Sequence, residues 1–163
     1  GIHLSGTSHV TLVDPVIEGD DNSASYAGIL VENSTAADTA TGCFWTRIIR
    51  PKVRQRAGAD GAAPTYGVIL RGAANATVIR DGSFTAVTGV QVEHHAGQTY
   101  VANGTLIDGN SFEGCTTAIS FNGAATSTFS GGRIVNNRAE SLTTFLSLTG
   151  STTQPAVPPP AMM

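Results

Sequence analysis

Short apolar stretches of two kinds alternate along most of the chain. In the first kind, apolar side chains recur at every second position, which places them on one side of an extended strand. These stretches begin 22 to 39 residues apart. They are Gly1 to Leu4, Gly28 to Val31, Gly67 to Leu70, Gly89 to Val92, Ala118 to Phe121 and Phe145 to Leu148. Their alternation predicts strands that each bury one face.

The second kind of stretch pairs two apolar residues with a polar corner. Its members are Leu12 to Pro15, Ile48 to Pro51, Val78 to Asp81, Leu106 to Gly109 and Ile134 to Asn137. They interleave with the first kind and recur at a similar distance. The fullest unit is TLIDGNSFEGCTTAISF, from Thr105 to Phe121. A regular repeat of this length is the signature of a solenoid.

The repeat predicts an all-β fold, a single-stranded parallel β-helix of about five to six coils. Each unit is too short for a strand–helix–strand crossover, and its Gly, Thr, Asn and Ser content is poor for helices. The Leu and Asn scaffold of leucine-rich repeats is missing. We expect the β-helix domain to span residues 1–150. Residues 151–163, STTQPAVPPPAMM, predict a Pro-rich extended C-terminal tail, with a disordered end as the alternative.

Alternation also predicts which side chains fill the interior. On the first kind of strand these are Ile29/Val31, Val68/Leu70, Val90/Val92, Ile119/Phe121 and Leu146/Leu148. A second inner wall is expected from Ile49, Ile79, Ile107 and Val135. Phe84 and Phe112, each five residues after its isoleucine, are expected to turn inward. Corner residues expected to accept positive φ are Gly82, Gly109, Asn110, Asn136 and Asn137.

Composition excludes few classes of protein or function. The 163 residues suit one domain, and the net charge of −3 gives no overall bias towards nucleic acid. No apolar run approaches the length of about 18 residues that crosses a bilayer, so we expect no membrane insertion. Cys43 and Cys115 fit neither a CxxC pair nor a metal spacing and are interpreted as buried thiols.

The repeats NGTLIDGNSFEGCTTAISF and ATVIRDGSFTAVTGVQV resemble the right-handed parallel β-helix proteins of the pectate-lyase-like superfamily. Within that group the chain looks most like the solenoid part of bacteriophage tailspikes and tail fibres. The resemblance implies right-handed winding, a homotrimer, a location in the virion tail and contact with bacterial surface polysaccharide (capsule or lipopolysaccharide). Secreted lyases, hydrolases and epimerases share the fold, so a polysaccharide-degrading enzyme is the alternative. A bacterial adhesin built on the same solenoid is a third possibility.

Basic residues form the main candidate binding site. Lys52, Arg54 and Arg56 alternate with uncharged residues, so all three should point outward from one strand. Arg50 and Arg80 are expected at the same position of adjacent coils. Guanidinium groups suit the carboxylates and phosphates of an anionic glycan. The alternative is a solvated face on which Arg80 pairs with Asp108. No aromatic residues interleave with the basic ones, which disfavours nucleic acid.

Acidic residues offer a weaker catalytic candidate. Asp81 and Asp108 fall near one corner of neighbouring coils, and Glu113 follows closely. Glycoside hydrolysis uses two carboxyl groups about 5–9.5 Å apart. Asp-Gly pairs also suit corners for structural reasons alone, which is the competing interpretation.

No metal or cofactor is expected. His94 and His95 have no third ligand at zinc spacing and are interpreted as surface histidines, with a pH-sensitive or metal contact as the alternative. The acidic pair Asp20 and Asp21 lacks the alternating ligands of a calcium loop. Phosphate-binding and dinucleotide-binding glycine motifs are missing. Outward apolar residues, namely Leu30, Ile69 and Leu106, are expected to be buried between three laterally packed chains.

Overall fold

The computed structural model describes residues 1–19, 26–33, 41–55, 64–95, 98–124, 127 and 129–150. Within these ranges the regular elements are all β-strands and no α-helix occurs, which confirms the all-β prediction. The tail predicted at residues 151–163 lies outside the described residues, as do Arg56, Asp20 and Asp21.

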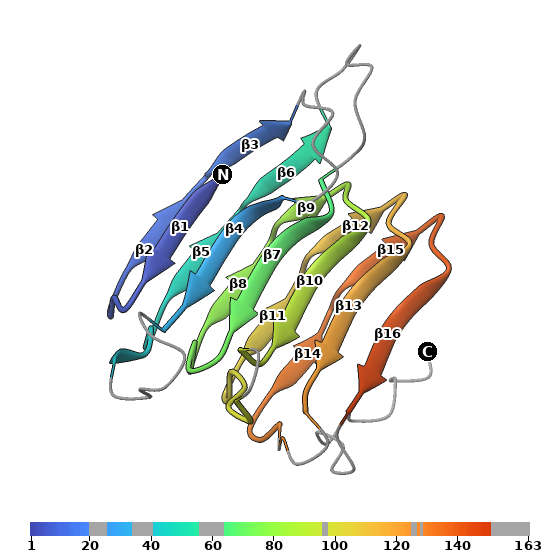
Figure 1. The fold of residues 1–163 in the computed structure, drawn as a ribbon. Coiled ribbons are helices and arrows are strands. Elements are labelled where there is room, and N and C mark those ends of the chain that lie inside the picture. Colours follow the sequence, from blue (N-terminus) through green and yellow to red (C-terminus); the bar gives the residue numbers. More distant parts are fainter. Residues whose placement is uncertain are drawn as a thin grey trace.

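The strands form three sheets, and in Figure 1 the strands of each sheet lie side by side in sequence order along one direction. The first sheet contains β1 (Ile2–Ser5), β4 (Ala27–Glu32), β7 (Tyr66–Arg71), β10 (Thr88–Glu93), β13 (Thr117–Asn122) and β16 (Thr144–Thr149). The second contains β2 (Thr11–Val13), β5 (Arg47–Ile49), β8 (Val78–Arg80), β11 (Leu106–Asp108) and β14 (Arg133–Val135). The third contains β3 (Val16–Gly19), β6 (Lys52–Gln55), β9 (Ser83–Phe84), β12 (Ser111–Glu113) and β15 (Arg138–Glu140).

Every pairing within the three sheets is parallel. Consecutive strands belong to different sheets, and each strand pairs with the strand three elements further along the chain. The chain therefore visits the first, second and third sheet in turn before it returns to the first. This arrangement is consistent with a parallel β-helix, and it confirms that the repeats stack side by side in parallel.

The predicted interior of the first sheet is confirmed. Ile29 pairs with Val68, and Val31 pairs with Leu70, and all four side chains are fully buried. The same two rows continue through Val90/Val92 and Ile119/Phe121, which are also buried. In the last strand, Leu146 and Leu148 are half-buried and pack against the same core. Period-two alternation thus places these side chains correctly.

The second inner wall differs from the prediction by one residue in two strands. Ile48, not Ile49, aligns with Ile79 and is fully buried. Ile134, not Val135, aligns with Ile107. A shift of one residue moves a side chain to the other face of a strand. Arg50 consequently aligns with Asp81, the residue after Arg80. The prediction that Arg50 and Arg80 occupy the same position of adjacent coils is therefore wrong.

The phenylalanine prediction is confirmed. Phe84 and Phe112 are both 0 % exposed, and their rings stack with centroids 5.3 Å apart. Gly67 and Gly89 leave the space for them, because a Cβ at Gly67 would lie 2.6 Å from Cδ1 of Phe84. At Gly89 the corresponding distance to Cδ1 of Phe112 is 2.3 Å. The large rings of the third sheet are therefore matched by missing side chains in the first.

The corner between the second and third sheets uses one left-handed residue per repeat. These residues are Asp14, Arg50, Asp81, Gly109 and Asn136, with φ between 51° and 67°. Of the predicted corner residues, Gly109 and Asn136 have this conformation, whereas Gly82, Asn110 and Asn137 follow it without positive φ.

Asn110 instead stabilises the corner through its side chain. The amide is 1 % exposed, accepts a hydrogen bond from the Gly82 N–H at 2.8 Å and donates to the Ile79 carbonyl at 3.0 Å. Its Nδ2 also donates to the side-chain oxygen of Asn137 at 3.0 Å. These contacts join neighbouring repeats inside the stack, where unpaired polar groups are costly.

Candidate functional site

Three of the predicted binding arginines form ion pairs with carboxylates of a neighbouring repeat. Arg50 binds Asp14 through two hydrogen bonds, Nε to Oδ1 at 2.6 Å and Nη2 to Oδ2 at 2.8 Å. The hydrogen bond from Arg50 is the main cause that lowers the pKa of Asp14. Arg54 Nε donates to Glu18 Oε1 at 2.9 Å. The positive charge on these two arginines is therefore already balanced within the chain.

Arg80 pairs with Asp108, as the structural interpretation of the basic residues had predicted. Its Nη2 donates to Oδ2 of Asp108 at 2.7 Å, and Nδ2 of Asn136 donates to Oδ1 at 3.0 Å. These two hydrogen bonds, the one from Arg80 first, lower the pKa of Asp108. A carboxylate kept ionised in this way does not suit the proton-donor role in glycoside hydrolysis.

Of the other candidate residues, Asp81 and Asp108 meet at one corner of neighbouring repeats, where the Asp81 N–H donates to the Asp108 carbonyl at 3.0 Å, whereas Lys52 and Glu113 lie on the third sheet. Lys52 is exposed on β6 and makes no ion pair with a carboxylate in the described ranges. Asp81 is an exposed corner residue with φ of 56°, and its neighbour in the next repeat is Gly109. Glu113 is exposed on the third sheet, next to Glu140. Asp81, Asp108 and Glu113 thus lie on a corner, the second sheet and the third sheet, respectively.

A charged cluster at the end of the first sheet was missed by the sequence analysis. Glu32, Arg71 and Glu93 are aligned on successive strands β4, β7 and β10. Arg71 donates from Nε to Glu93 Oε1 at 2.6 Å and from Nη1 to Glu32 Oε2 at 3.1 Å. Both carboxylates are only 15 % exposed, so one guanidinium balances two partly buried acids. The signal that was missed is the charged residue that directly follows the last inward apolar residue of β4, β7 and β10.

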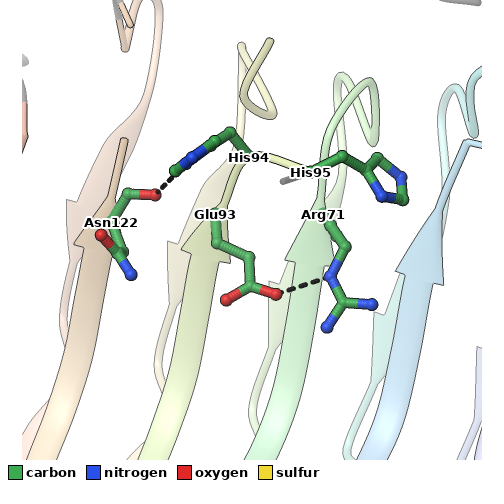
Figure 2. A pocket seen from close by; sticks show the side chains of 5 residues that line it. All are labelled: Arg71, Glu93, His94, His95 and Asn122. Carbon is green, nitrogen blue, oxygen red and sulfur yellow. Dashed lines mark hydrogen bonds and ion pairs between the residues drawn. The ribbon is translucent and has the colours of Figure 1, made fainter. Parts of the chain in front are cut away.

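A pocket of about 420 Å³ lies over this cluster and is lined by Arg71, Glu93, His94, His95 and Asn122. Figure 2 shows these five side chains. His94 Nδ1 lies 3.2 Å from the Asn122 carbonyl. His95 turns to the other side, where its Nε2 lies 3.9 Å from Glu32 Oε2. Both histidines are half-buried, and the side chain of His95 is 17 % exposed. All five lining residues have polar side chains, and the charges of Arg71 and Glu93 balance each other in an ion pair.

A second hollow, of about 290 Å³, lies where β2 and β5 begin and is lined by His9, Thr11, Trp45 and Arg47. The His9 and Trp45 rings stack with centroids 4.7 Å apart and planes 18° from parallel. Trp45 is 56 % exposed. None of these four residues was among the predicted site residues. The signal in the sequence is an aromatic residue at a corner position that later repeats fill with alanine or glycine.

No group of three or more metal-ligating side chains occurs in the described part of the chain. Cys43 and Cys115 are free and buried, as predicted. Across the described residues, no helix has the length and apolar character that spanning a membrane requires. No family model, no curated protein and no solved structure matches the chain.

Proposed function

We propose that the chain is a structural, receptor-facing segment of a trimeric phage tailspike or tail fibre. In this role it belongs to the virion tail and contacts polysaccharide on the bacterial surface. The observation that supports the proposal best is the stack of three all-parallel sheets, whose interior is filled by aligned apolar rows. Such a stack is stiff along its axis, because every repeat is bound to the next by backbone hydrogen bonds and by packing.

We further infer that the three sheets are the walls of one right-handed β-helix. The strands group as β1–β3, β4–β6, β7–β9, β10–β12 and β13–β15, with β16 beginning another repeat. That grouping corresponds to five to six coils. Connections between parallel strands of one sheet are right-handed in about 98% of known cases, which supports this hand.

Exposed apolar side chains support lateral association. Val13 and Val16 are 56 % and 59 % exposed and flank the same corner. Exposed apolar patches commonly mark contacts with partners. Leu30, Ile69 and Leu106, which the sequence predicted as contacts between chains, give weaker support. Ile69 is only 4 % exposed within one chain, and Leu30 and Leu106 are half-buried.

Sedimentation equilibrium of the full chain tests the assembly. We expect three times the mass of one chain, and we expect Val13→Asp combined with Val16→Asp to give monomers. Val87→Asp is the matched control, because Val87 is also exposed, at 44 %. A monomeric wild-type protein contradicts the trimer.

Incubation with purified capsule and lipopolysaccharide tests the contact with polysaccharide. Retention of unchanged polymer supports the proposal. Release of oligosaccharides that is lost in Asp81→Asn or Asp108→Asn would replace it with a polysaccharide-degrading enzyme.

A further inference from the structure

The corner that leads into the second sheet holds one left-handed residue in each repeat. These residues are His9, Trp45, Ala76, Gly104 and Gly131, with φ from 54° to 66°. This conformation is unfavourable for a large side chain, and later repeats accordingly use alanine or glycine. The first two repeats instead carry two aromatic rings, one of them the chain's single tryptophan. Local strain of this kind is often kept where a side chain has a function.

Backbone contacts hold the two rings in place. The His9 N–H donates to the Phe44 carbonyl at 2.9 Å, and the Trp45 N–H donates to the Asn75 carbonyl at 3.1 Å. The His9 ring covers one part of the indole, with 4.7 Å between centroids, while Trp45 stays 56 % exposed. The Phe44 ring lies beside Trp45, with 5.8 Å between the ring centroids and 52° between the ring planes. The result is a pre-positioned apolar surface that is open to solvent.

Polar groups stand next to this surface. Thr11 and Arg47 each follow an aromatic residue by two positions, and they are paired neighbours on β2 and β5. All four side chains line the hollow of about 290 Å³. Arg47 is exposed and forms no ion pair with a carboxylate in the described ranges. Carboxylate partners do exist for the arginines at 50, 54, 71, 80 and 138.

We propose that His9, Thr11, Trp45 and Arg47 form a binding site for an acidic sugar unit of a polysaccharide. The apolar C–H face of the sugar ring packs on the indole of Trp45, as amphipathic ligands do on exposed aromatic rings. The sugar carboxylate accepts hydrogen bonds from the Arg47 guanidinium. The Thr11 hydroxyl donates to or accepts from a ring hydroxyl. This inference rests on the proposed contact with surface polysaccharide, and it moves that contact away from the carboxylate-paired arginines.

The neighbouring repeats explain why the site is local and why a glycan fits better than a nucleic acid. After His9 and Trp45, the same corner position is occupied by Ala76 and then Gly104, so no further ring continues the surface. The position of Arg47 is taken by Val78 in the next strand.

Single-stranded nucleic acid needs a series of stacking side chains along a basic groove. One platform with one cation suits a single acidic sugar.

The experiment uses Trp45 as its own reporter. The emission of this single tryptophan is recorded in the full chain during titration with oligogalacturonate, oligosialic acid and hyaluronan oligosaccharides. A neutral maltohexaose and a thymidine oligonucleotide serve as comparison ligands. We expect at least one acidic oligosaccharide to shift the emission to shorter wavelength, because stacking removes water from the indole.

Variants are compared by polarisation of the same oligosaccharide carrying a fluorescent label. We expect Trp45→Ala and Arg47→Gln each to weaken binding about tenfold or more. Trp45→Ala should fold normally, because Ala76 has the same backbone conformation in the next repeat. The matched controls are Phe145→Ala, which removes another exposed aromatic ring, and Arg133→Gln, another exposed arginine of the second sheet. Both should bind as wild type does.

Several results would overturn the inference. They are no response to any acidic oligosaccharide, an equal response to maltohexaose, tighter binding of the oligonucleotide, or wild-type affinity in Trp45→Ala. The proposed function fails separately. If Trp45→Ala still retains capsule as wild type does, this site is wrong and the wider function stands. If a monomeric protein binds the acidic oligosaccharide through Trp45, the site stands and the trimeric assembly is wrong.

Discussion

The fit between Gly89 and Phe112 gives the sharpest test of the packing. Gly89→Ala would place a Cβ 2.3 Å from Cδ1 and 2.5 Å from Cε1 of Phe112. Normal contact needs more than 3.4 Å. The ring must therefore move by about an ångström, yet Phe84 is stacked against it with centroids 5.3 Å apart. Overpacking of this kind costs about 1–3 kcal/mol.

A double-mutant cycle separates this clash from general damage. Phe112→Ala alone removes a fully buried ring and should cost about 3–5 kcal/mol. In the double variant the ring is absent, so the new methyl group at position 89 fills part of the space and loses its clash. We therefore expect the double variant to be more stable than the sum predicts, by about 1–2 kcal/mol. The Ala118 carbonyl, 2.7 Å from the new Cβ, limits the recovery.

The free energy of unfolding is measured for the four proteins by urea titration at one fixed protein concentration, because assembly makes stability concentration-dependent. Gly114→Ala is a useful control: the site has left-handed φ but nothing lies within 4 Å of the added Cβ. It should show backbone strain without coupling to Phe112→Ala. Additive effects for Gly89 and Phe112 would refute the packing argument.

Three further predictions concern hydrogen bonds, charge and thiol chemistry. Asn110→Ala leaves the Gly82 N–H without its partner and should cost about 1–3 kcal/mol in urea unfolding; a neutral result contradicts the inter-repeat role. The pKa of Asp108 is lowered in the folded state, first by the hydrogen bond from Arg80, so its contribution to stability is present above its ordinary value of 3.8 and is lost as the pH falls through the folded pKa. Asp108→Asn should therefore flatten the decline in stability below about pH 4, and an unchanged acid limb contradicts this. Burial raises the pKa of the Cys115 thiol, so it should react with a disulfide reagent at pH 8 only after urea is added, and a rapid native reaction would show that the interior is open.

The arginines show why charge could not be interpreted from sequence order alone. Arg50, Arg54 and Arg80 were predicted to contribute to one outward basic surface, which favoured an anionic ligand. In the structure each meets an acid from another repeat, 36 or 28 residues away. By contrast, Arg47 forms no ion pair within the described ranges and lies beside the exposed ring of Trp45. Whether an arginine is free to bind an anionic ligand depends on which acid of the neighbouring repeat is aligned with it. The sequence predicts that alignment only to within about one residue.

The register error in the second sheet has a similar origin. Ile49-Arg50 and Ile79-Arg80 look equivalent, and the sequence match favours aligning them. The structure aligns Ile48 with Ile79 and Val53 with Phe84, so that both inward positions are filled. The register is set by burial and not by the similarity of the two dipeptides, because a slip of one residue would move Ile48 and Val53 to the outer face.

The sequence by itself determined the all-β composition, the parallel stacking and the inward rows of the first sheet. These follow from period-two alternation and from the repeat, which are local or nearly local properties of the chain. Only the tertiary structure decided the exact register of the second sheet, the partners of the arginines and the pairing of His9 with Trp45. Those features depend on which side chains meet across repeats, and contacts of a few ångströms between distant residues are fixed by packing, not by sequence spacing.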